Sequence, residues 1–269
     1  MSQDYKAHFG LTGKAFHKSI PVASLFRYPQ LDEVHYLLTS AVADGHVAVL
    51  TGPVGAGKST TLRAFAASLD GARQQVLYVG YTSADRGIFR EMAHGLGLTP
   101  AHLKGDLVVQ LHHAIQREWQ RQGRAALLVL DDAHLLPDAL LEEVRQLLNF
   151  EMDSATHLGL VLVGQPALLA RLREPRHEAL ARRAPIRCQL VGLSRQEAVA
   201  YVGAHLAAAG GDPELFSPEA VDLAYQHAQG LPRELCHVCV YALIRAAWQD
   251  LPRVERVTVE EVLRALSAK

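Results

Sequence analysis

The segment HVAVLTGPVGAGKSTTLRAFAASL, residues 46–69, joins a short apolar run to an amphipathic helical pattern through a glycine-rich turn. Its first part, HVAVLT, is the kind of run that forms a buried strand. The turn GPVGAGKS, from Gly52 to Ser59, matches the pattern G-x-x-x-x-G-K-[ST]. Because strand, turn and helix follow one another in the order that this pattern requires, the segment predicts a phosphate-binding loop (P-loop) within an α/β fold.

Each residue type in this loop suits a nucleoside triphosphate. The glycines allow backbone N–H groups and the start of the helix to point at phosphate oxygens. Lys58 brings a positive charge to the β- and γ-phosphates, and Ser59 offers a hydroxyl to Mg²⁺. We therefore expect ATP and Mg²⁺ as cofactors, with Ser59 as one metal-binding residue. The expected cofactor-binding residues are Gly52, Pro53, Val54, Gly55, Ala56, Gly57, Lys58, Ser59, Thr60 and, far along the chain, Arg233.

Apolar runs and amphipathic stretches alternate beyond the P-loop, up to about Leu193. The runs are rich in leucine and β-branched residues, and they begin at His46, Val76, Ala125, Leu158 and Ile186. Helical periodicity covers residues 58–69, 86–96, 106–122 and 137–150. Nearly all-apolar strands are typical of parallel sheets buried on both faces. The pattern therefore predicts a P-loop α/β ATPase domain, residues 46–193, with a parallel sheet covered by helices on both faces.

The chain on either side of this domain has a different pattern. After Leu193 the strand signal ends and three or four helical patterns follow, with start signals such as Ser217 before Pro218. Residues 194–269 are therefore predicted to form a helical lid domain. Residues 1–45 combine scattered aromatic residues with a helical stretch, which predicts an N-terminal aromatic linker and helix.

The N-terminal aromatic residues Phe9, Phe16 and Tyr28 allow two interpretations. Flat apolar rings near a P-loop can stack against adenine. Such residues more often belong to a hydrophobic core. Cys236 and Cys239 form a C-x-x-C pair without a second ligand pair and are expected to be core thiols rather than metal ligands.

Composition restricts the classes of function. The 269 residues are 49% hydrophobic and 20% charged, as in ordinary globular proteins. The longest apolar runs fall well short of the ~20 residues that cross a bilayer, and the N-terminus carries no export signal, so we expect a cytoplasmic protein with no membrane partner. Three cysteines fit a reducing compartment. A net charge of -1 means that any contact with nucleic acid must come from a local basic patch.

A pair of aspartates follows the apolar run that begins at Ala125. The segment AALLVLDDAHLLP places Asp131 and Asp132 at the carboxyl end of a buried strand, where open α/β sheets bind ligands. This arrangement indicates a Walker B element, in which Asp131 serves Mg²⁺ and Asp132 orients water or acts as a base. Two aspartates that cap a turn are the alternative.

Further polar residues complete the candidate site. Gln165 follows the next apolar run, so its amide could sense the γ-phosphate or position water. Arg182, Arg183 and Arg187 stand just before the last predicted strand, from which one guanidinium could reach the γ-phosphate of a neighbouring subunit. Arg233 lies just inside a predicted helix of the lid and could swing over the nucleotide. The alternative for Gln165 is a turn residue, and the alternative for the three arginines is a solvated basic face. The alternative for Arg233 is a surface arginine at a helix start.

The order of these elements resembles that of the AAA+ ATPases: a P-loop, a Walker B strand, a polar strand end, arginines before the last strand, and a lid opened by G-x-P-R. Four stretches more narrowly resemble the ExeA/GspA-type ATPases: FGLTGKAFHKSIP (9–21), LLNFE (147–151), LVGQPALLARL (162–172) and GLPRELCHVC (230–239). ATPases of this type occur as membrane-tethered secretion components and as short helpers of DNA transposition, similar in role to TnsC, MuB and IstB.

The resemblance implies a role for each matching residue: Lys58 and Ser59 in Walker A, Asp131 on Mg²⁺, Gln165 as sensor 1, Arg183 as the arginine finger that acts in trans with Arg182 as its competitor, and Arg233 as sensor 2. The expected catalytic set is Lys58, Asp131, Asp132, Gln165, Arg183 and Arg233. Most relatives carry Glu where this chain has Asp132, which is one methylene shorter. Because a displacement of ~1 Å at a reacting centre costs about 10²-fold in rate, we expect slow hydrolysis and an ATP-dependent assembly switch.

These expectations combine into a function hypothesis. The chain is expected to be an ATPase that assembles as a ring or helical filament on double-stranded DNA, selects target DNA with a targeting protein, and recruits or activates a transposase. Arg86, Arg90 and Lys104 are the expected phosphate contacts, with an exposed helix and loop as the alternative. An ExeA/GspA-type secretion or envelope-assembly ATPase lacking its membrane part is the second hypothesis. The third hypothesis is a small-molecule kinase. We expect the DNA helper because the sequence ends at Lys269 without a predicted membrane span.

Overall fold

The computed structural model describes residues 4–80, 87–151 and 155–267. Two compact units make up the chain. The helical unit consists of Met1–Pro29, Val54–Gly57 and Val191–Lys269, and the sheet unit consists of Gln30–Pro53 and Lys58–Leu190. The segment expected as one N-terminal piece, residues 1–45, is thus divided between the two units after Pro29, and the sheet unit ends three residues before the expected boundary at 193.

Five parallel strands form the sheet, in the order β2-β3-β4-β1-β5. Their bounds are β1 Val47–Thr51, β2 Gln74–Val79, β3 Ala125–Leu130, β4 Leu158–Gly164 and β5 Ile186–Gln189. Every residue of β1 and β4 is buried, as expected of apolar runs covered on both faces. The predicted parallel sheet is confirmed. All five strands end at the same side of the sheet, here called the carboxyl edge, and begin at the amino edge.

Helices follow the strands of the sheet unit in the alternation that the sequence predicts. Their bounds are α2 Pro29–Ala43, α3 Lys58–Ser68, α4 Gly87–Gly95, α5 Lys104–Gln122, α6 Asp138–Leu147, α7 Ala167–Leu172 and α8 Glu178–Arg183, with short 3-10 helices η2 Ala133–Leu135 and η4 Pro175–His177. Helix α6 ends three residues earlier than predicted. Strand β5 is shorter than its predicted run because the chain leaves the sheet unit after Leu190.

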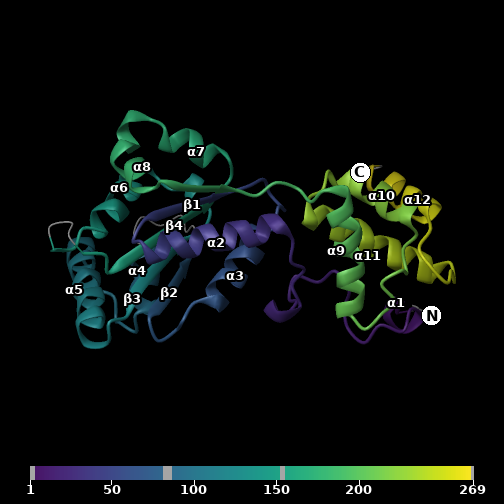
Figure 1. Ribbon diagram of the computed structural model, residues 1–269, viewed down its shortest axis with the longest axis horizontal. Coiled ribbons are helices and arrows are strands. Elements are labelled where there is room, and N and C mark those ends of the chain that lie inside the picture. Colours follow the sequence, from purple (N-terminus) through teal and green to yellow (C-terminus); the bar gives the residue numbers. More distant parts are fainter. Residues whose placement is uncertain (1–3, 81–86, 152–154, 268–269) are drawn as a thin grey trace. The chain divides into compact units, whose positions relative to one another are not determined.

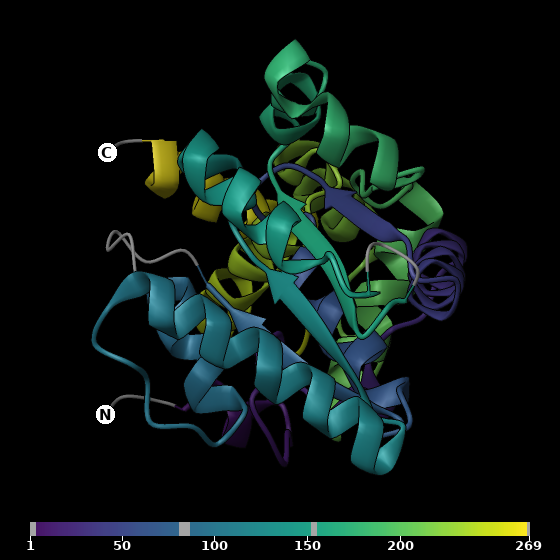
Figure 2. The same ribbon diagram turned by 90° about the vertical axis from the view of Figure 1, so that its left-hand side faces the viewer.

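The helices cover both faces of the sheet. Alternate strand residues face opposite sides, so Leu128 of β3 packs in a core with buried residues of α4 to α8, whereas its neighbour Leu127 faces the other side. That second side carries α2 and α3, which meet where His35 packs edge-on against Phe65 with 6.0 Å between ring centroids. Figure 1 shows α2 and α3 on one face of the strands, and Figure 2 shows α5, drawn in teal, in front of them.

The helical unit contains six described helical segments: α1 Tyr5–His8, the 3-10 helix η1 Val22–Ser24, α9 Arg195–Ala208, α10 Pro218–Ala228, α11 Pro232–Trp248 and α12 Arg256–Ser267. Local chemistry explains where two of them begin. Ser194 and Glu197 form a capping box at the start of α9. Ser217 caps α10 and Pro218 occupies its first turn, as predicted. Among the described residues, no helix is both long enough and apolar enough to span a bilayer.

The core of the helical unit contains polar as well as apolar side chains. Phe16 is 6% exposed and stacks on His205, with 5.5 Å between ring centroids. Phe9 and Tyr28 pack against the same core, so the N-terminal aromatic residues have the more common of their two expected roles. Burial lowers the pKa of His205 to about 4, which keeps its ring neutral at physiological pH.

The cysteines of this core are free thiols, as expected. Cys239 is fully buried, and the sulfur of Cys236 lies 3.3 Å from the hydroxyl of Tyr201. Burial raises the pKa of Cys236 to about 11, so its thiol stays protonated and unreactive at neutral pH.

Candidate nucleotide-binding site

The P-loop connects β1 to α3. Gly55 and Gly57 have φ angles of +85° and +96°, a backbone region that side chains with a Cβ rarely adopt. Lys58 is the first residue of α3, and its Nζ donates hydrogen bonds to the carbonyl oxygens of Gly52 at 2.8 Å and Pro53 at 3.0 Å. The ammonium group therefore lies against the first two residues of the loop, and Lys58 stands at the N-terminal end of α3, where phosphate is favourably bound.

Backbone hydrogen bonds place the start of the loop within the carboxyl edge. The N–H of Gly52 donates to the carbonyl oxygen of Gly164, the last residue of β4, at 3.2 Å. On the other side, the N–H of Leu190 donates to the carbonyl oxygen of Thr51 at 2.7 Å. The loop thus leaves the sheet between β4 and β5, and Gln165 follows β4 directly beside it. This is the edge at which open α/β sheets bind ligands.

Asp131 stands at the same edge, directly after β3. Its N–H donates to the carbonyl oxygen of Val79 at 2.9 Å, and it continues the strand alternation on the face that α2 and α3 cover. One carboxylate oxygen, Oδ1, accepts a hydrogen bond from the N–H of Asp132 at 2.9 Å. The other, Oδ2, accepts one from the hydroxyl of Tyr78 at 2.6 Å. The carboxylate is therefore held in one orientation.

Asp132 has a left-handed backbone, with φ 53° and ψ 32°, and its side chain is exposed. Aspartate and asparagine tolerate this conformation better than longer side chains do, because their short polar groups bond locally. The backbone thus supplies a reason for Asp at a position where the resemblance leads one to expect Glu.

Gln165 contacts a residue that is not among the predicted site residues. Its N–H donates to Nδ1 of His134, 3.4 Å away, so this nitrogen acts as the acceptor. A Cβ on the preceding Gly164 would lie 3.1 Å from the same Nδ1 and 3.2 Å from the His134 backbone nitrogen, so a larger residue would require His134 to move by a few tenths of an ångström. His134 thereby joins the segment after Asp131 to the end of β4. The motif D-D-A-H contains the histidine, but only strand pairing shows what it meets.

Arg171 of α7 contacts the same turn. Its guanidinium donates to the carbonyl oxygens of His134 and Leu136, both at 2.8 Å, and to the carboxylate of Asp138. Asp138 also accepts a hydrogen bond from His177 at 3.0 Å. The Arg171 guanidinium, foremost among these partners, lowers the pKa of Asp138. This network is a second contact that local sequence patterns do not predict.

Tyr78 is the third such contact. Tyr78 lies on β2, one residue before the strand ends, and is 56% exposed. Loss of hydration and the bond to Asp131 raise the pKa of Tyr78, so its hydroxyl remains a donor at physiological pH. The sequence shows an aromatic residue near a strand end, but the pairing that brings it to Asp131 depends on strand order.

The donor groups at this edge fit Mg²⁺. Ser59, in the first turn of α3, supplies a hydroxyl, and Asp131 supplies a carboxylate whose two oxygens each accept one hydrogen bond and retain a further lone pair. Mg²⁺ prefers oxygen ligands and is usually bound by one or two protein groups together with substrate phosphates and water. These residues therefore suit a metal ion that arrives with a nucleotide.

The predicted arginine finger lies at the amino edge. Arg183 ends α8, three residues before β5, and its guanidinium donates to Oδ1 of Asn149 at 2.6 Å. It also lines a hollow of about 350 Å³ with residues at the starts of β1 and β4. Because strands rise about 3.3 Å per residue, the five residues of β1 separate this edge from the P-loop by about 13 Å. Arg183 and the P-loop thus occupy opposite edges of the sheet.

The two neighbouring arginines have different partners. Arg182 is exposed and donates to Glu178 at 2.6 Å. Arg187 donates to the carbonyl oxygens of Ala184 at 3.2 Å and Ala181 at 3.3 Å, so it closes the end of α8. In its contact with Asn149, Arg183 donates to a neutral amide, whereas Arg182 donates to a carboxylate and Arg187 to backbone carbonyl oxygens.

Arg233, the predicted sensor 2, belongs to the helical unit. It is the second residue of α11 and is exposed, and its N–H donates to the carbonyl oxygen of Gly55 at 3.2 Å. A Cβ on Gly55 would lie 3.1 Å from that of Arg233, which is a second reason for glycine in the loop. The role of its guanidinium stays a prediction.

The residues predicted to contact DNA are not alike in the structure. Arg86 lies outside the described residues. Arg90 is exposed on α4. Lys104 begins α5 and forms an ion pair with Glu143 at 2.8 Å, so part of its charge is already neutralised. Arg90 is therefore the stronger candidate of the two described residues.

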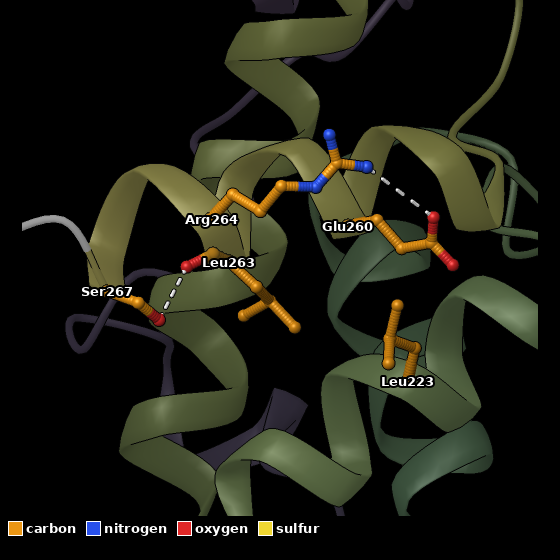
Figure 3. Close-up of a pocket in the computed structure, with 5 residues that line it drawn as sticks. All are labelled: Leu223, Glu260, Leu263, Arg264 and Ser267. Atoms are coloured by element: carbon orange, nitrogen blue, oxygen red, sulfur yellow. Dashed lines mark hydrogen bonds and ion pairs between the residues drawn. The ribbon is translucent and has the colours of Figure 1, made fainter.

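A larger hollow, of about 550 Å³, lies in the helical unit between α10 and α12. Figure 3 shows its lining by Leu223, Glu260, Leu263, Arg264 and Ser267, with Ser267 donating to the carbonyl oxygen of Leu263 and Arg264 facing Glu260. None of the predicted site residues lines it. The described features that suit a nucleotide therefore gather at the sheet edge and not in this hollow.

Comparison with known proteins agrees with this geometry. Residues 42–172 match the family described as AAA domain. Together with the strand order and the P-loop, this match defines the fold as that of the AAA+ P-loop NTPases. By sequence, the chain is similar to General secretion pathway protein A of Aeromonas hydrophila, with 30% identity over 254 residues that make up 90% of this chain and 45% of the relative. The chain thus spans less than half the length of this relative.

Solved structures show the same fold. The ORC1 protein of Aeropyrum pernix, in complex with DNA, matches with a TM-score of 0.70 and 18% identity over 92% of this chain and 68% of its own. The ORC2 protein of the same organism matches with a TM-score of 0.71 and 15% identity over 93% and 70%. The RuvB branch migration motor of Thermotoga maritima matches with 0.56 and 16% over 88% and 68%. At these identities the likeness concerns the fold alone.

Proposed function

We propose that the protein is an ATPase whose subunits assemble when ATP is bound and that converts ATP and water to ADP and phosphate. The placement of Arg183 carries this proposal. The P-loop, Asp131 and Gln165 gather at the carboxyl edge, whereas Arg183 stands at the amino edge, about 13 Å away along β1. A guanidinium that is too distant for the phosphates of its own chain is available to a neighbouring subunit.

The other roles in binding and hydrolysis belong to residues of the chain that holds the nucleotide. Lys58 and the backbone N–H groups of the loop bind the phosphates, and Gln165 contacts the γ-phosphate. Mg²⁺, when held by Ser59 and Asp131, supplies charge neutralisation on the phosphate oxygens. Asp132 orients the attacking water. The arriving Arg183 of the neighbour then stabilises the charge that develops in the transition state.

The rate of hydrolysis depends on the reach of Asp132. Its carboxylate is one methylene shorter than that of Glu, which places it about 1 Å from the position that Glu would reach. Slow hydrolysis prolongs the ATP-bound state. Bound ATP then acts mainly as a link between subunits, in a ring or a helical filament, and hydrolysis releases them.

We assign duplex DNA as the surface on which this assembly forms, and a transposase and a targeting protein as its partners in the cytoplasm. The exposed guanidinium of Arg90 supports a phosphate contact. The structural neighbour ORC1 of Aeropyrum pernix is in complex with DNA. On this proposal the protein helps transposition by selecting target DNA and recruiting the transposase.

A second candidate function is a secretion or envelope-assembly ATPase. It is favoured by the 30% identity to General secretion pathway protein A of Aeromonas hydrophila over 90% of this chain. The ATP site and the finger would act in the same way in both cases. The two candidates differ in the partner: the first requires duplex DNA and the second does not.

A mobility-shift assay on duplex DNA distinguishes the candidates. It compares ATP, ADP and a non-hydrolysable ATP analogue, at several salt concentrations. The DNA helper is expected to bind with ATP and with the analogue but not with ADP, and its log-affinity should fall with log salt by about 0.9 for each phosphate contacted. No binding together with intact ATP-dependent assembly would favour the second candidate. Binding that does not depend on the nucleotide would contradict ATP-dependent assembly on DNA.

A further inference from the structure

Tyr78 and Asp131 meet because of the register between β2 and β3. Tyr78 pairs with Val129, two residues before Asp131, so the two side chains point to the same face of the sheet on a diagonal. Neighbouring strands lie about 4.8 Å apart and two residues advance about 6.6 Å along a strand, so the two backbones are about 8 Å apart, a distance that the two side chains together bridge. The ring of Tyr78 thus crosses to the neighbouring strand, and its hydroxyl donates to Oδ2 of Asp131 at 2.6 Å.

This hydrogen bond leaves the carboxylate with one defined orientation. A bond from the hydroxyl to one oxygen and from the N–H of Asp132 to the other prevents rotation about the last side-chain torsion. Each oxygen keeps one lone pair for a metal-bound water. Groups that orient a metal-binding side chain in this way strongly affect metal affinity, although they do not touch the metal.

We propose that Tyr78 is a positioning residue for Mg²⁺: its hydroxyl orients the Asp131 carboxylate and so sets the Mg²⁺ concentration at which nucleotide is held tightly. This inference rests on the proposed ATP site. It gives the edge strand β2 a role in the site, in addition to the roles of the P-loop, the Walker B aspartates and Gln165.

The exposure of Tyr78 separates this role from a role in packing. The residue is 56% exposed, so its ring contributes little to the buried core. An exposed hydroxyl is satisfied by water and gains little for folding from a protein partner. Replacement by phenylalanine therefore leaves the sheet intact and removes only the bond to the carboxylate.

The test measures binding of a fluorescent ATP analogue while Mg²⁺ is increased from zero. Tyr78→Phe is expected to raise the Mg²⁺ concentration at half-maximal tight binding by about 10-fold, whereas nucleotide affinity in EDTA stays unchanged. Tyr36→Phe is the matched control, because Tyr36 is 70% exposed on α2 and its hydroxyl has no part in the site. This control should keep the Mg²⁺ dependence of the unaltered protein.

Two results would overturn the inference. One is an unchanged Mg²⁺ dependence in Tyr78→Phe, and the other is an equal loss of affinity with and without Mg²⁺, which would show a general effect on the fold. A double-mutant cycle adds a stricter condition: in the Asp131→Asn background, Tyr78→Phe should shift the Mg²⁺ dependence no further. Failure of the unaltered protein to bind the analogue at all would instead contradict the proposed ATP site.

Discussion

The two edges of the sheet carry different chemistry. The carboxyl edge combines a glycine-rich loop, the ammonium group of Lys58 and the carboxylate of Asp131, each held by bonds within the edge. The amino edge carries the guanidinium of Arg183, which donates to the side-chain amide of Asn149. The groups at the carboxyl edge thus suit a triphosphate, whereas the amino edge contributes an arginine.

A parallel sheet can thus keep two sets of functional groups apart. Strands are rigid spacers, so residues at opposite ends cannot meet in the same chain. A site that needs both sets of groups is completed only when two chains come together. Substitutions at the two edges and in the helical unit should therefore have separable effects on hydrolysis and stability.

The largest effect is expected from the amino edge. Arg183→Ala should reduce assembly-stimulated hydrolysis by about 10³-fold, the lower end of the range for arginine fingers, and leave nucleotide affinity unchanged. Arg182→Ala is the matched control, because Arg182 is paired with Glu178. Steady-state ATPase rates at rising protein concentration measure the effect. If the Arg182 variant loses the stimulation and the Arg183 variant keeps it, the assignment of the finger is wrong.

A second substitution tests the role of Asp132 at the carboxyl edge. Asp132→Glu is expected to increase the single-turnover rate by up to about 10²-fold, since the carboxylate then reaches the attacking water. The same substitution should cost about 1 kcal/mol of stability, because the left-handed backbone at this position favours the shorter side chain. Single-turnover hydrolysis and denaturant unfolding measure the two effects. A rate equal to that of the unaltered protein would exclude slow hydrolysis caused by reach.

A smaller effect is expected from Asn149→Ala. A hydrogen bond to a charged group contributes about 1.5 kcal/mol, so loss of the amide should reduce the assembly-stimulated rate by about tenfold. The carbonyl oxygen of Asn149 still accepts a hydrogen bond from His112 at 2.9 Å, so the local turn survives. Rates without assembly should not change. An equal decrease in those rates would show that Asn149 acts on the fold rather than on the finger.

The smallest effect on catalysis is expected from the helical unit. The pKa of His205 is lowered to about 4 by burial, from an unfolded value near 6.5. Between these values the unfolded chain binds a proton that the folded chain does not, so stability decreases as pH falls through this window, by on the order of 3 kcal/mol. His205→Leu should remove this dependence and leave ATPase constants at pH 7 unchanged.

Denaturant unfolding of the two proteins at pH 7 and pH 4.5 measures this effect. The difference in stability between the leucine variant and the unaltered protein should shift in favour of the variant at the lower pH. Other acidic groups contribute equally to both proteins and cancel in the comparison. A difference that is the same at both pH values would show that His205 does not titrate in the folded core.

Local sequence patterns predicted much of the fold. The strands Ala125–Leu130 and Leu158–Gly164 have the bounds that their apolar runs indicated, and Ser217 caps its helix as expected. One boundary that differs is a place where the chain leaves a unit. Strand β5 ends at Gln189 although its apolar run continues, because the residues from Val191 onward pack in the helical unit.

Local patterns were enough to predict the P-loop, the parallel α/β sheet and the residues at strand ends, because each depends on residues that are close along the chain. The contacts of Tyr78 with Asp131 and of Gln165 with His134, and the place of Arg183 at the edge opposite the P-loop, follow from the three-dimensional fold. Strand order and register bring together residues 53 or 31 positions apart, and no local pattern encodes which strands become neighbours.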